Sequence, residues 1–387
     1  MSEYQYVAFR AVDAPLNDEQ LTFANEQSSH AEVSRWSLVV EYNYSEFHGD
    51  VDGLLRQGFD VFLQYANYGT RKIKLRLPHG MPFAKRVWST YMEGRTLQWE
   101  PDAKGHGGIL TLDPFLEAGD FDDVWELQEY LDDVVRVRNR LLRGDLRALY
   151  LLWLGAVCDE DHIPEETIEP PVPHGIAEIA DDGGELLWFF GADPLLLVAA
   201  GEDVGPAPAD DAQDRASRWV NALGEQPAKD LLLKLLTGDT ASVKAGVLAD
   251  IRDAQDSGGW PTSDKRRSLE QLLERAEELR AEQRAKEARK AQEKAKRKAA
   301  KAARQRAERM KEMVAEPQKW IREAKRLAKE RGTDNYEAAA NILADLRDAV
   351  GGDKGVSMAH RCAVDLAKQY PTLNRLKSAL RKRGLLA

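Results

Sequence analysis

Residues 265–315 lie within the longest stretch of this chain that has neither Gly nor Pro, and Pro317 follows two residues after them. The stretch is built mainly from Ala, Lys, Arg, Glu, Gln and Leu, all of which propagate a helix well. It therefore predicts one continuous helix, about 75 Å long at a rise of 1.5 Å per residue. Ser263 and Asp264 are both acceptable N-caps, and Pro317 is expected to end the helix.

The two ends of this predicted helix differ in what they can bury. Leucines occupy its first turns, at Leu269, Leu272, Leu273 and Leu279. A seam with four- and three-residue spacing follows, broken by Gln292 and Arg306; it consists of Ala281, Ala285, Ala288, Ala295, Ala299 and Ala302. Alanine buries little area, so the seam is a weak coiled-coil signal. Like charges four residues apart, at Lys286, Lys290 and Lys294, repel one another. The helix is expected to stay solvated unless an acidic partner is supplied.

The charge of the chain is divided between its two ends. The net charge is -10 overall, but residues 264–387 hold 33 Lys+Arg against 19 Asp+Glu, a net +14. Residues 1–263 consequently carry -24. Within the basic part, residues 280–311 hold 14 basic and 4 acidic side chains. Such a segment attracts polyanions and repels itself.

Length, hydropathy and cysteine content exclude several classes of protein. A chain of 387 residues suffices for two or three folded units. Its longest apolar runs, 151–157 and 195–200, fall far short of the roughly 18 to 20 residues of a membrane-spanning helix. The first residues lack the pattern of a secretory signal, so a cytoplasmic protein is expected. Two cysteines, Cys158 and Cys362, exclude a disulfide framework and a zinc site built mainly on cysteine.

The expected fold class is α+β, beginning with a mixed α/β sheet domain over residues 1–118. Aromatic, β-branched or alternating residues predict strands over 4–12, 33–44, 71–77, 95–100 and 108–112. Asn17 with Gln20 predicts a capped helix, and apolar spacing predicts a second helix over 50–65. The order strand, helix, strand, helix, strand is compatible with a split βαβ, ferredoxin-like sandwich. The glycine-rich residues 104–108 predict a hairpin turn.

Helical periodicity dominates the rest of the chain. Residues 119–204 predict a helical domain packed on the sheet. Its helices are expected from 120 or 122 to 144, over 146–157 and within 176–201. Residues 159–173, which include Glu169, predict an acidic surface loop. Residues 205–262 predict a short helical segment whose inward side chains are Trp219, Leu223, Leu231, Leu232, Leu235 and Leu236. The long basic helix takes 263–316. A C-terminal helical module takes 317–387, with helices over 318–331, 335–350, 357–370 and 373–383.

Two parts of the chain resemble bacterial proteins. Residues 1–9 (MSEYQYVAF), 13–16 (DAPL) and 65–69 (YANYG) look like the start of a family of hypothetical bacterial proteins. Trp320, residues 336–338 (YEA) and residues 343–347 (LADLR) are similar to the C-terminal helical region of bacterial SWIM-type zinc-finger proteins. A SWIM zinc site needs Cys-X-Cys and a later Cys-X-His, and neither is present. The resemblance therefore implies a docking or assembly module without a metal site.

Motifs for catalysis, cofactors or metals do not stand out. The seven histidines give no HExxH or four-apart pair, and no nucleophile elbow or dinucleotide fingerprint occurs, so no cofactor is expected. Acidic clusters occur at 120–123, 132–133 and 159–161. They are explained by the acidic composition of residues 1–263 and are not taken as a metal site. Trp153, Trp188 and Trp219 are expected to be buried, whereas Trp88, Trp99 and Trp260 lie nearer loops and are candidate anchors for a partner.

The candidate functional residues lie in the basic helix and the C-terminal module. Seven side chains are candidate polyanion ligands: Lys294, Lys296, Arg297, Lys298, Lys301, Arg304 and Arg306. Four are candidate partner-docking residues: Trp320, Tyr336, Leu343 and Leu346. Aromatic residues for base stacking are absent from the basic helix, so any nucleic-acid binding there is expected to be sequence-independent and salt-sensitive.

The sequence favours a non-enzymatic interaction or scaffold protein, in which an acidic body and a basic helical arm dock a protein partner. The alternative is sequence-independent nucleic-acid binding through residues 280–311. A second alternative is an enzyme with an unrecognised site near His106 or residues 158–162. A membrane partner is not expected, and the sequence leaves the oligomeric state open.

Overall fold

The computed structural model describes residues 3–116, 127–157, 166–208, 212–237, 240–253 and 259–386. Its fold is α+β, as predicted, and the chain divides into two compact units, Met1–Gln283 and Arg284–Ala387. Each unit has a hydrophobic core of its own. Within the described residues, none of the helices combines the length and apolar content that a bilayer crossing requires.

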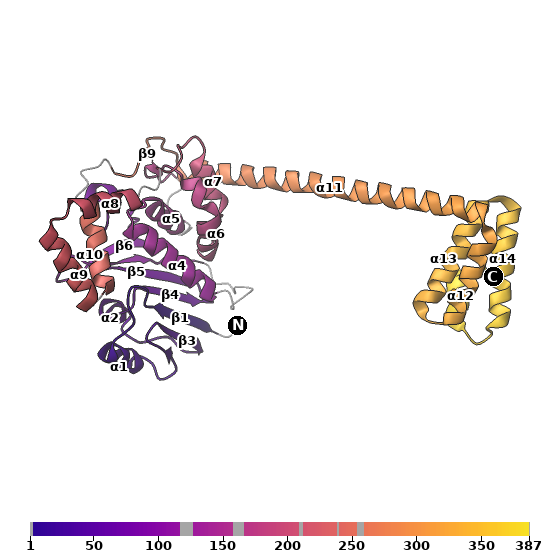
Figure 1. The fold of residues 1–387 in the computed structure, drawn as a ribbon, viewed down its shortest axis with the longest axis horizontal. Helices are drawn as coiled ribbons and strands as arrows, with labels where there is room; N and C mark the ends of the chain where they lie inside the picture. The colour runs from indigo at the N-terminus through magenta and orange to yellow at the C-terminus, as the bar shows by residue number, and fades with distance from the viewer. Residues whose placement is uncertain are drawn as a thin grey trace. The chain divides into compact units, whose positions relative to one another are not determined.

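Unit 1 is built on a seven-stranded sheet (Figure 1). Its strands are β1 (Tyr4–Arg10), β2 (Glu32–Val33), β3 (Ser37–Asn43), β4 (Val61–Ala66), β5 (Thr70–Leu77), β6 (Leu97–Pro101) and β7 (Gly108–Leu112). Their order in the sheet is β2-β3-β1-β4-β5-β7-β6. The strands predicted over 4–12, 33–44, 71–77, 95–100 and 108–112 are confirmed in type, and the turn at 104–108 joins the β6–β7 hairpin.

The predicted mixed, ferredoxin-like arrangement is wrong. β1 lies between β3 and β4 and is antiparallel to both, and every pairing between described strands is antiparallel. A βαβ unit needs two parallel strands joined by a crossover. Here the helix between β1 and β3 joins strands that run in opposite directions.

The helix predicted over 50–65 is half wrong. Helix α2 covers only Val51–Gln57, with Asp50 accepting a hydrogen bond from the Gly53 amide at 2.8 Å, and β4 follows Gly58. Five of the six β4 residues are buried, because this central strand is covered on both faces. The apolar residues of β4 are therefore mostly consecutive and do not alternate with polar residues. A consecutive apolar run is also compatible with a helix.

Helices cover both faces of the sheet (Figure 1). Val7 and Phe9 of β1 belong to the core shared with α1 (Asp18–Glu26) and α2, whereas Tyr6 and Ala8 belong to the core shared with α4 (Leu127–Leu142). The predicted capping box of α1 is confirmed, since the Asn17 side chain accepts from the Gln20 amide and the Gln20 side chain accepts from the Asn17 amide.

The helices predicted between 119 and 204 are confirmed where the structure describes them. They are α4, the buried α5 (Arg147–Ala156), the short 3-10 helix η3 (Ile176–Ile179), α6 (Ala180–Phe189) and α7 (Leu195–Gly201). In the chain, α3 (Lys85–Trp88) and η1 (Ser89–Tyr91) lie between β5 and β6, and β8 (Val172–Pro173) pairs with β9 (Thr262–Ser263). Trp153 is buried, but Trp188 is 56% exposed, so the prediction of burial is wrong for Trp188.

The next helices, α8 (Ala212–Ala222), α9 (Glu225–Thr237) and α10 (Thr240–Asp253), pack mainly on one another. The prediction that Leu232 and Leu236 point inward is wrong, because they are 60% and 83% exposed and Leu233 is 61% exposed. Helix α9 packs on α10, and these three leucines lie on the part of its surface that the described residues leave exposed.

Leu236→Ala is expected to change the stability of the chain by less than about 0.5 kcal/mol, because an exposed side chain removes little apolar area from water. Urea denaturation followed by far-UV circular dichroism measures the change. A loss above 2 kcal/mol would mean that Leu236 is packed as the sequence predicted.

The long helix α11 spans Leu269–Ala315. It begins later than predicted, since its cap is Ser268 rather than Ser263 or Asp264. The Gln271 amide donates to Ser268 Oγ at 3.2 Å, and the Ser268 amide donates to Gln271 Oε1 at 3.1 Å. Pro317 is the first residue of α12, so the predicted end is confirmed.

The C-terminal module contains the four predicted helices: α12 (Pro317–Glu330), α13 (Thr333–Val350), α14 (Gly352–Gln369) and α15 (Asn374–Lys382). They share one core with Met313 near the end of α11. Arg309 of α11 also lies over the Trp320 ring, 5.0 Å from its centroid. The end of α11 is thus part of the module.

Candidate functional site

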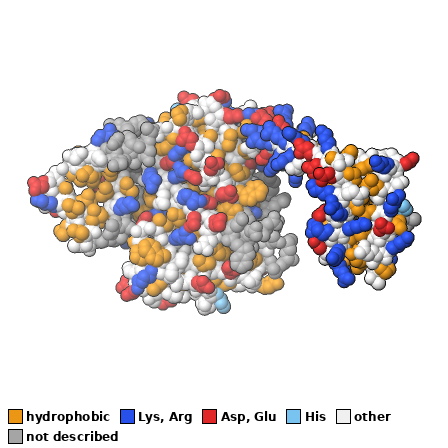
Figure 2. Space-filling view, turned by 45° about the vertical axis from the view of Figure 1, so that its right-hand side comes forward, with side chains coloured by type: hydrophobic (Ala, Val, Ile, Leu, Met, Phe, Trp, Pro, Cys, Tyr) orange, Lys and Arg blue, Asp and Glu red, His pale blue; other side chains and the backbone are white. Residues whose placement is uncertain are grey.

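The most distinctive surface of unit 2 is the part of α11 that precedes the module. We call residues 284–306 the basic segment. All 23 of its residues are exposed, including the alanines of the predicted seam. It holds 11 Lys and Arg against two Glu. Figure 2 shows Lys and Arg side chains gathered along this helix.

Six of these side chains form a line along the helix. At about 100° per residue, positions with four- and three-residue spacing fall within about 80° of one another. We call the six side chains at such positions the basic row: Lys286, Lys290, Lys294, Arg297, Lys301 and Arg304. The alanine seam lies on the opposite side of the helix, where Arg284 and Arg306 are also found, so the segment has a row of six basic side chains on one face and mostly small side chains on the other.

Most of the candidate polyanion ligands have no anionic partner within the described part of the chain. Arg297 approaches Glu293 at 3.9 Å and Arg304 approaches Glu308 at 3.3 Å, both on exposed helix surface. Arg306 is on the alanine side and pairs with Asp345 of α13 at 3.6 Å. Neither an ion pair nor a hydrogen bond to another described residue is found for the side chains of four lysines: Lys294, Lys296, Lys298 and Lys301.

The start of α11 is fixed to unit 1 by a buried ion pair that the sequence did not reveal. Glu169, which the sequence places in a surface loop, is 1% exposed. Arg267 donates to both of its oxygens, at 2.9 and 3.0 Å, and also to the carbonyls of Ala199 and Ala200. The Tyr150 hydroxyl donates to Glu169 as well. Burial and the adjacent Glu169 carboxylate raise the pKa of Tyr150 well above its usual value.

Two further ion pairs follow along the first turns of α11. Arg275 donates to both oxygens of Glu202 at 2.8 Å, and this hydrogen bonding lowers the pKa of Glu202. Arg280 pairs with Asp193. With Leu269, Leu272 and Ala276 in the core, this part of α11 belongs to unit 1.

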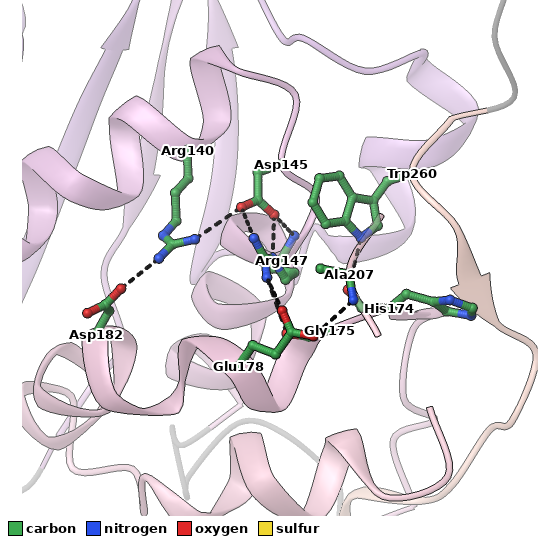
Figure 3. A network of polar contacts seen from close by, with 9 residues as sticks. All are labelled: Arg140, Asp145, Arg147, His174, Gly175, Glu178, Asp182, Ala207 and Trp260. Carbon is green, nitrogen blue, oxygen red and sulfur yellow. Dashed lines mark hydrogen bonds and ion pairs between the residues drawn. The ribbon is translucent and has the colours of Figure 1, made fainter. Parts of the chain in front are cut away.

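The chain that leads into α11 is held by a second polar network (Figure 3). Asp145 receives hydrogen bonds from Arg147 at 2.8 and 2.9 Å and from Arg140 at 3.2 Å. Trp260 lies over the Arg147 guanidinium, 4.9 Å away, and its indole N–H donates to the His174 carbonyl at 3.1 Å. Trp260, a candidate partner anchor from the sequence, thus already contacts residues of its own unit.

A third buried cluster fixes α4 to the sheet. Arg138 is fully buried and donates to Asp13 at 2.6 and 3.1 Å and to Asp60 at 2.6 Å. Burial raises the pKa of Asp60, and the charge of Arg138 offsets this only in part. Burial also favours a higher pKa for Asp13, but the hydrogen bonds and ion pair between Asp13 and Arg138 outweigh burial and lower the pKa of Asp13. No motif in the sequence marks these three residues.

The four candidate partner-docking residues lie in the module core or at its edge. Tyr336, Leu343 and Leu346 of α13 are buried, and Trp320 is half-buried and packed against the same core. Their apolar character is therefore explained by packing between α11, α12, α13, α14 and α15. A docking role for these side chains stays a prediction.

The described residues contain no group of three or more His, Cys, Asp and Glu side chains placed to hold a metal ion. Asp132 pairs with Arg10, and Asp133 pairs with Arg136. The acidic residues at 120–123 and 159–161, with Cys158 and His162, lie outside the described residues. His106 is exposed in the β6–β7 turn.

Comparison with protein-family models, curated proteins and solved structures finds no match to this chain. The candidate site therefore rests on the geometry and electrostatics of its own residues.

Proposed function

We propose that this chain is a cytoplasmic, non-enzymatic interaction protein, and that the basic segment of α11 is the surface that attracts an anionic partner. The observation that carries the proposal is the exposure of the basic row together with the lack of ion pairs, in the described structure, for Lys294, Lys296, Lys298 and Lys301. Like charges at this spacing repel, and an anionic partner relieves the repulsion.

The division of charge supports the same reading. Unit 2 carries 28 Lys+Arg against 13 Asp+Glu, a net +15, whereas unit 1 carries a net -25. The buried Glu169–Arg267 pair fixes the start of α11, and the module core fixes its end. We infer that the segment between them is held as a helix by its two anchored ends, with the charges of Lys294, Lys296, Lys298 and Lys301 available to bind.

The C-terminal module is proposed as a protein-docking element, in line with its resemblance to the helical region of SWIM-type proteins. A partner would contact the outer surface of the module, since Tyr336, Leu343 and Leu346 face its interior.

The proposal predicts that the full chain binds a generic polyanion, poly-L-glutamate, at 50 mM salt, and that a variant with Lys290, Lys294, Lys298 and Lys301 replaced by Gln binds at least tenfold more weakly. Gln propagates a helix about as well as Lys, so the fold is kept. Isothermal titration calorimetry measures the affinity, and circular dichroism checks the helix content. Equal binding by both proteins would contradict the assignment of the interface to the basic segment.

A further inference from the structure

We infer that the partner of the basic segment is the phosphate backbone of a nucleic-acid duplex, bound without sequence preference. The inference rests on the proposed function and names its partner. It follows from what the segment contains, how its charges are arranged, and what it lacks.

The composition of the segment argues against a protein partner. Residues 284–306 contain only Ala, Arg, Lys, Glu and Gln, and all of them are exposed. Protein interfaces depend on a few well-packed aromatic and other large side chains, and Lys, Glu and Ala are depleted in them. The segment offers no such anchor that could fill a desolvated pocket. A partner must therefore be bound through charge alone.

Phosphate backbones are bound in this way. Lys and Arg that neutralise phosphates release condensed counterions, and this release supplies free energy without a buried apolar core. Such contacts position a protein on the duplex and carry no sequence information. The lysines without ion pairs have their charges available for this purpose.

The arrangement of the charges fits a duplex rather than a single strand. The basic row extends over about 27 Å of helix, and Lys296 and Lys298 lie roughly 100° to either side of it. A helix about 10–12 Å across fits the major groove of B-DNA, about 12 Å wide, where flanking side chains reach phosphates of both strands. Single-strand binders add aromatic platforms for base stacking, and the segment has none.

The local charge of the basic segment, rather than the net charge of the whole chain, governs this contact at physiological salt. Charges separated by more than the Debye length, about 8 Å at 0.15 M, are largely screened in water. The net charge of +9 on the basic segment therefore dominates the electrostatic attraction where the segment contacts the duplex.

The test is fluorescence anisotropy of the full chain with labelled 20-base-pair DNA and RNA duplexes, a dT20 single strand and labelled poly-L-glutamate. With about six phosphates neutralised, the duplex affinity is expected to fall about 10³-fold between 50 and 200 mM salt, a log–log slope of about -5. The variant with Lys290, Lys294, Lys298 and Lys301 replaced by Gln is expected to lose about 3 to 4 units of that slope.

A matched control changes the same net charge elsewhere in unit 2. Lys329, Lys354, Lys368 and Lys382 lie on the surface of the module, and their replacement by Gln is expected to leave duplex affinity within twofold. Binding to either duplex with these responses supports the inference, and the tighter duplex identifies the source. Binding of poly-L-glutamate but neither duplex overturns the inference and leaves the proposed function standing. Tighter binding of dT20 than of the duplexes also overturns it, and loss of all binding overturns both proposals.

Discussion

Arg138→Met is expected to destabilise unit 1 by about 3–5 kcal/mol at pH 7. The substitution keeps an unbranched side chain of similar length, but it removes the cation that Asp13 and Asp60 share inside the protein. Two carboxylates are then left near one another with part of their solvation lost. A buried charge without its partner costs far more than the pair itself contributes, so the loss is expected to be large.

The same variant is expected to recover stability as the pH falls. Without Arg138, burial raises the folded-state pKa of both carboxyl groups above the unfolded value, which is about 4 for Asp. A raised folded pKa gives a stabilising contribution that is complete below the unfolded pKa and is lost as the pH rises through the folded pKa. The deficit relative to the wild-type chain is therefore expected to be largest near pH 7 and to shrink toward pH 5.

Urea denaturation monitored by tryptophan fluorescence measures this effect, because eight of the nine tryptophans belong to unit 1. Arg143→Met is the matched control, since Arg143 is exposed just after the same helix, and it is expected to cost less than about 0.5 kcal/mol. Equal unfolding midpoints for the Arg138 and Arg143 variants, or a deficit that grows on acidification, would show that the cluster does not stabilise unit 1.

The sequence predicts well those elements whose local signal agrees with their surroundings. Asn17 and Gln20 form the expected capping box because both partners lie three residues apart on the chain. The long helix and its exposed alanines could be predicted because a segment of Ala, Lys and Arg has nothing to bury. The candidate polyanion ligands are accordingly found on exposed helix surface.

The sequence predicts poorly what depends on distant partners. Glu169 stands among prolines and other acidic residues, which is typical of a surface loop, and the cation that makes its burial favourable is supplied by Arg267, 98 positions later. The leucines of α9 have the spacing of a buried face, but their exposure depends on which helices pack nearby. For β4, burial on both faces removed the alternation that distinguishes a strand from a helix.

Arg267→Met is expected to cost unit 1 about 3–5 kcal/mol and to loosen the start of α11. Glu169 loses the guanidinium that binds both of its oxygens and, among the described residues, keeps the Tyr150 hydroxyl as a side-chain donor. The carbonyls of Ala199 and Ala200 lose a donor at the same time. Because Glu169 is fully buried, its carboxylate cannot regain water without a local opening of the structure.

Hydrogen exchange separates this effect from general destabilisation, since amides of residues 269–280 are expected to lose protection more than those of β4, which lies in the centre of the sheet. Arg266→Met is the matched control, because Arg266 is the adjacent residue and is exposed. The stability and the exchange pattern of this variant are expected to match those of the wild-type chain.

Glu169→Gln in the Arg267→Met background is expected to restore part of the lost stability, since it removes the unpaired charge. Absence of that recovery would mean that Arg267 acts through its packing and its carbonyl contacts, not through the buried ion pair.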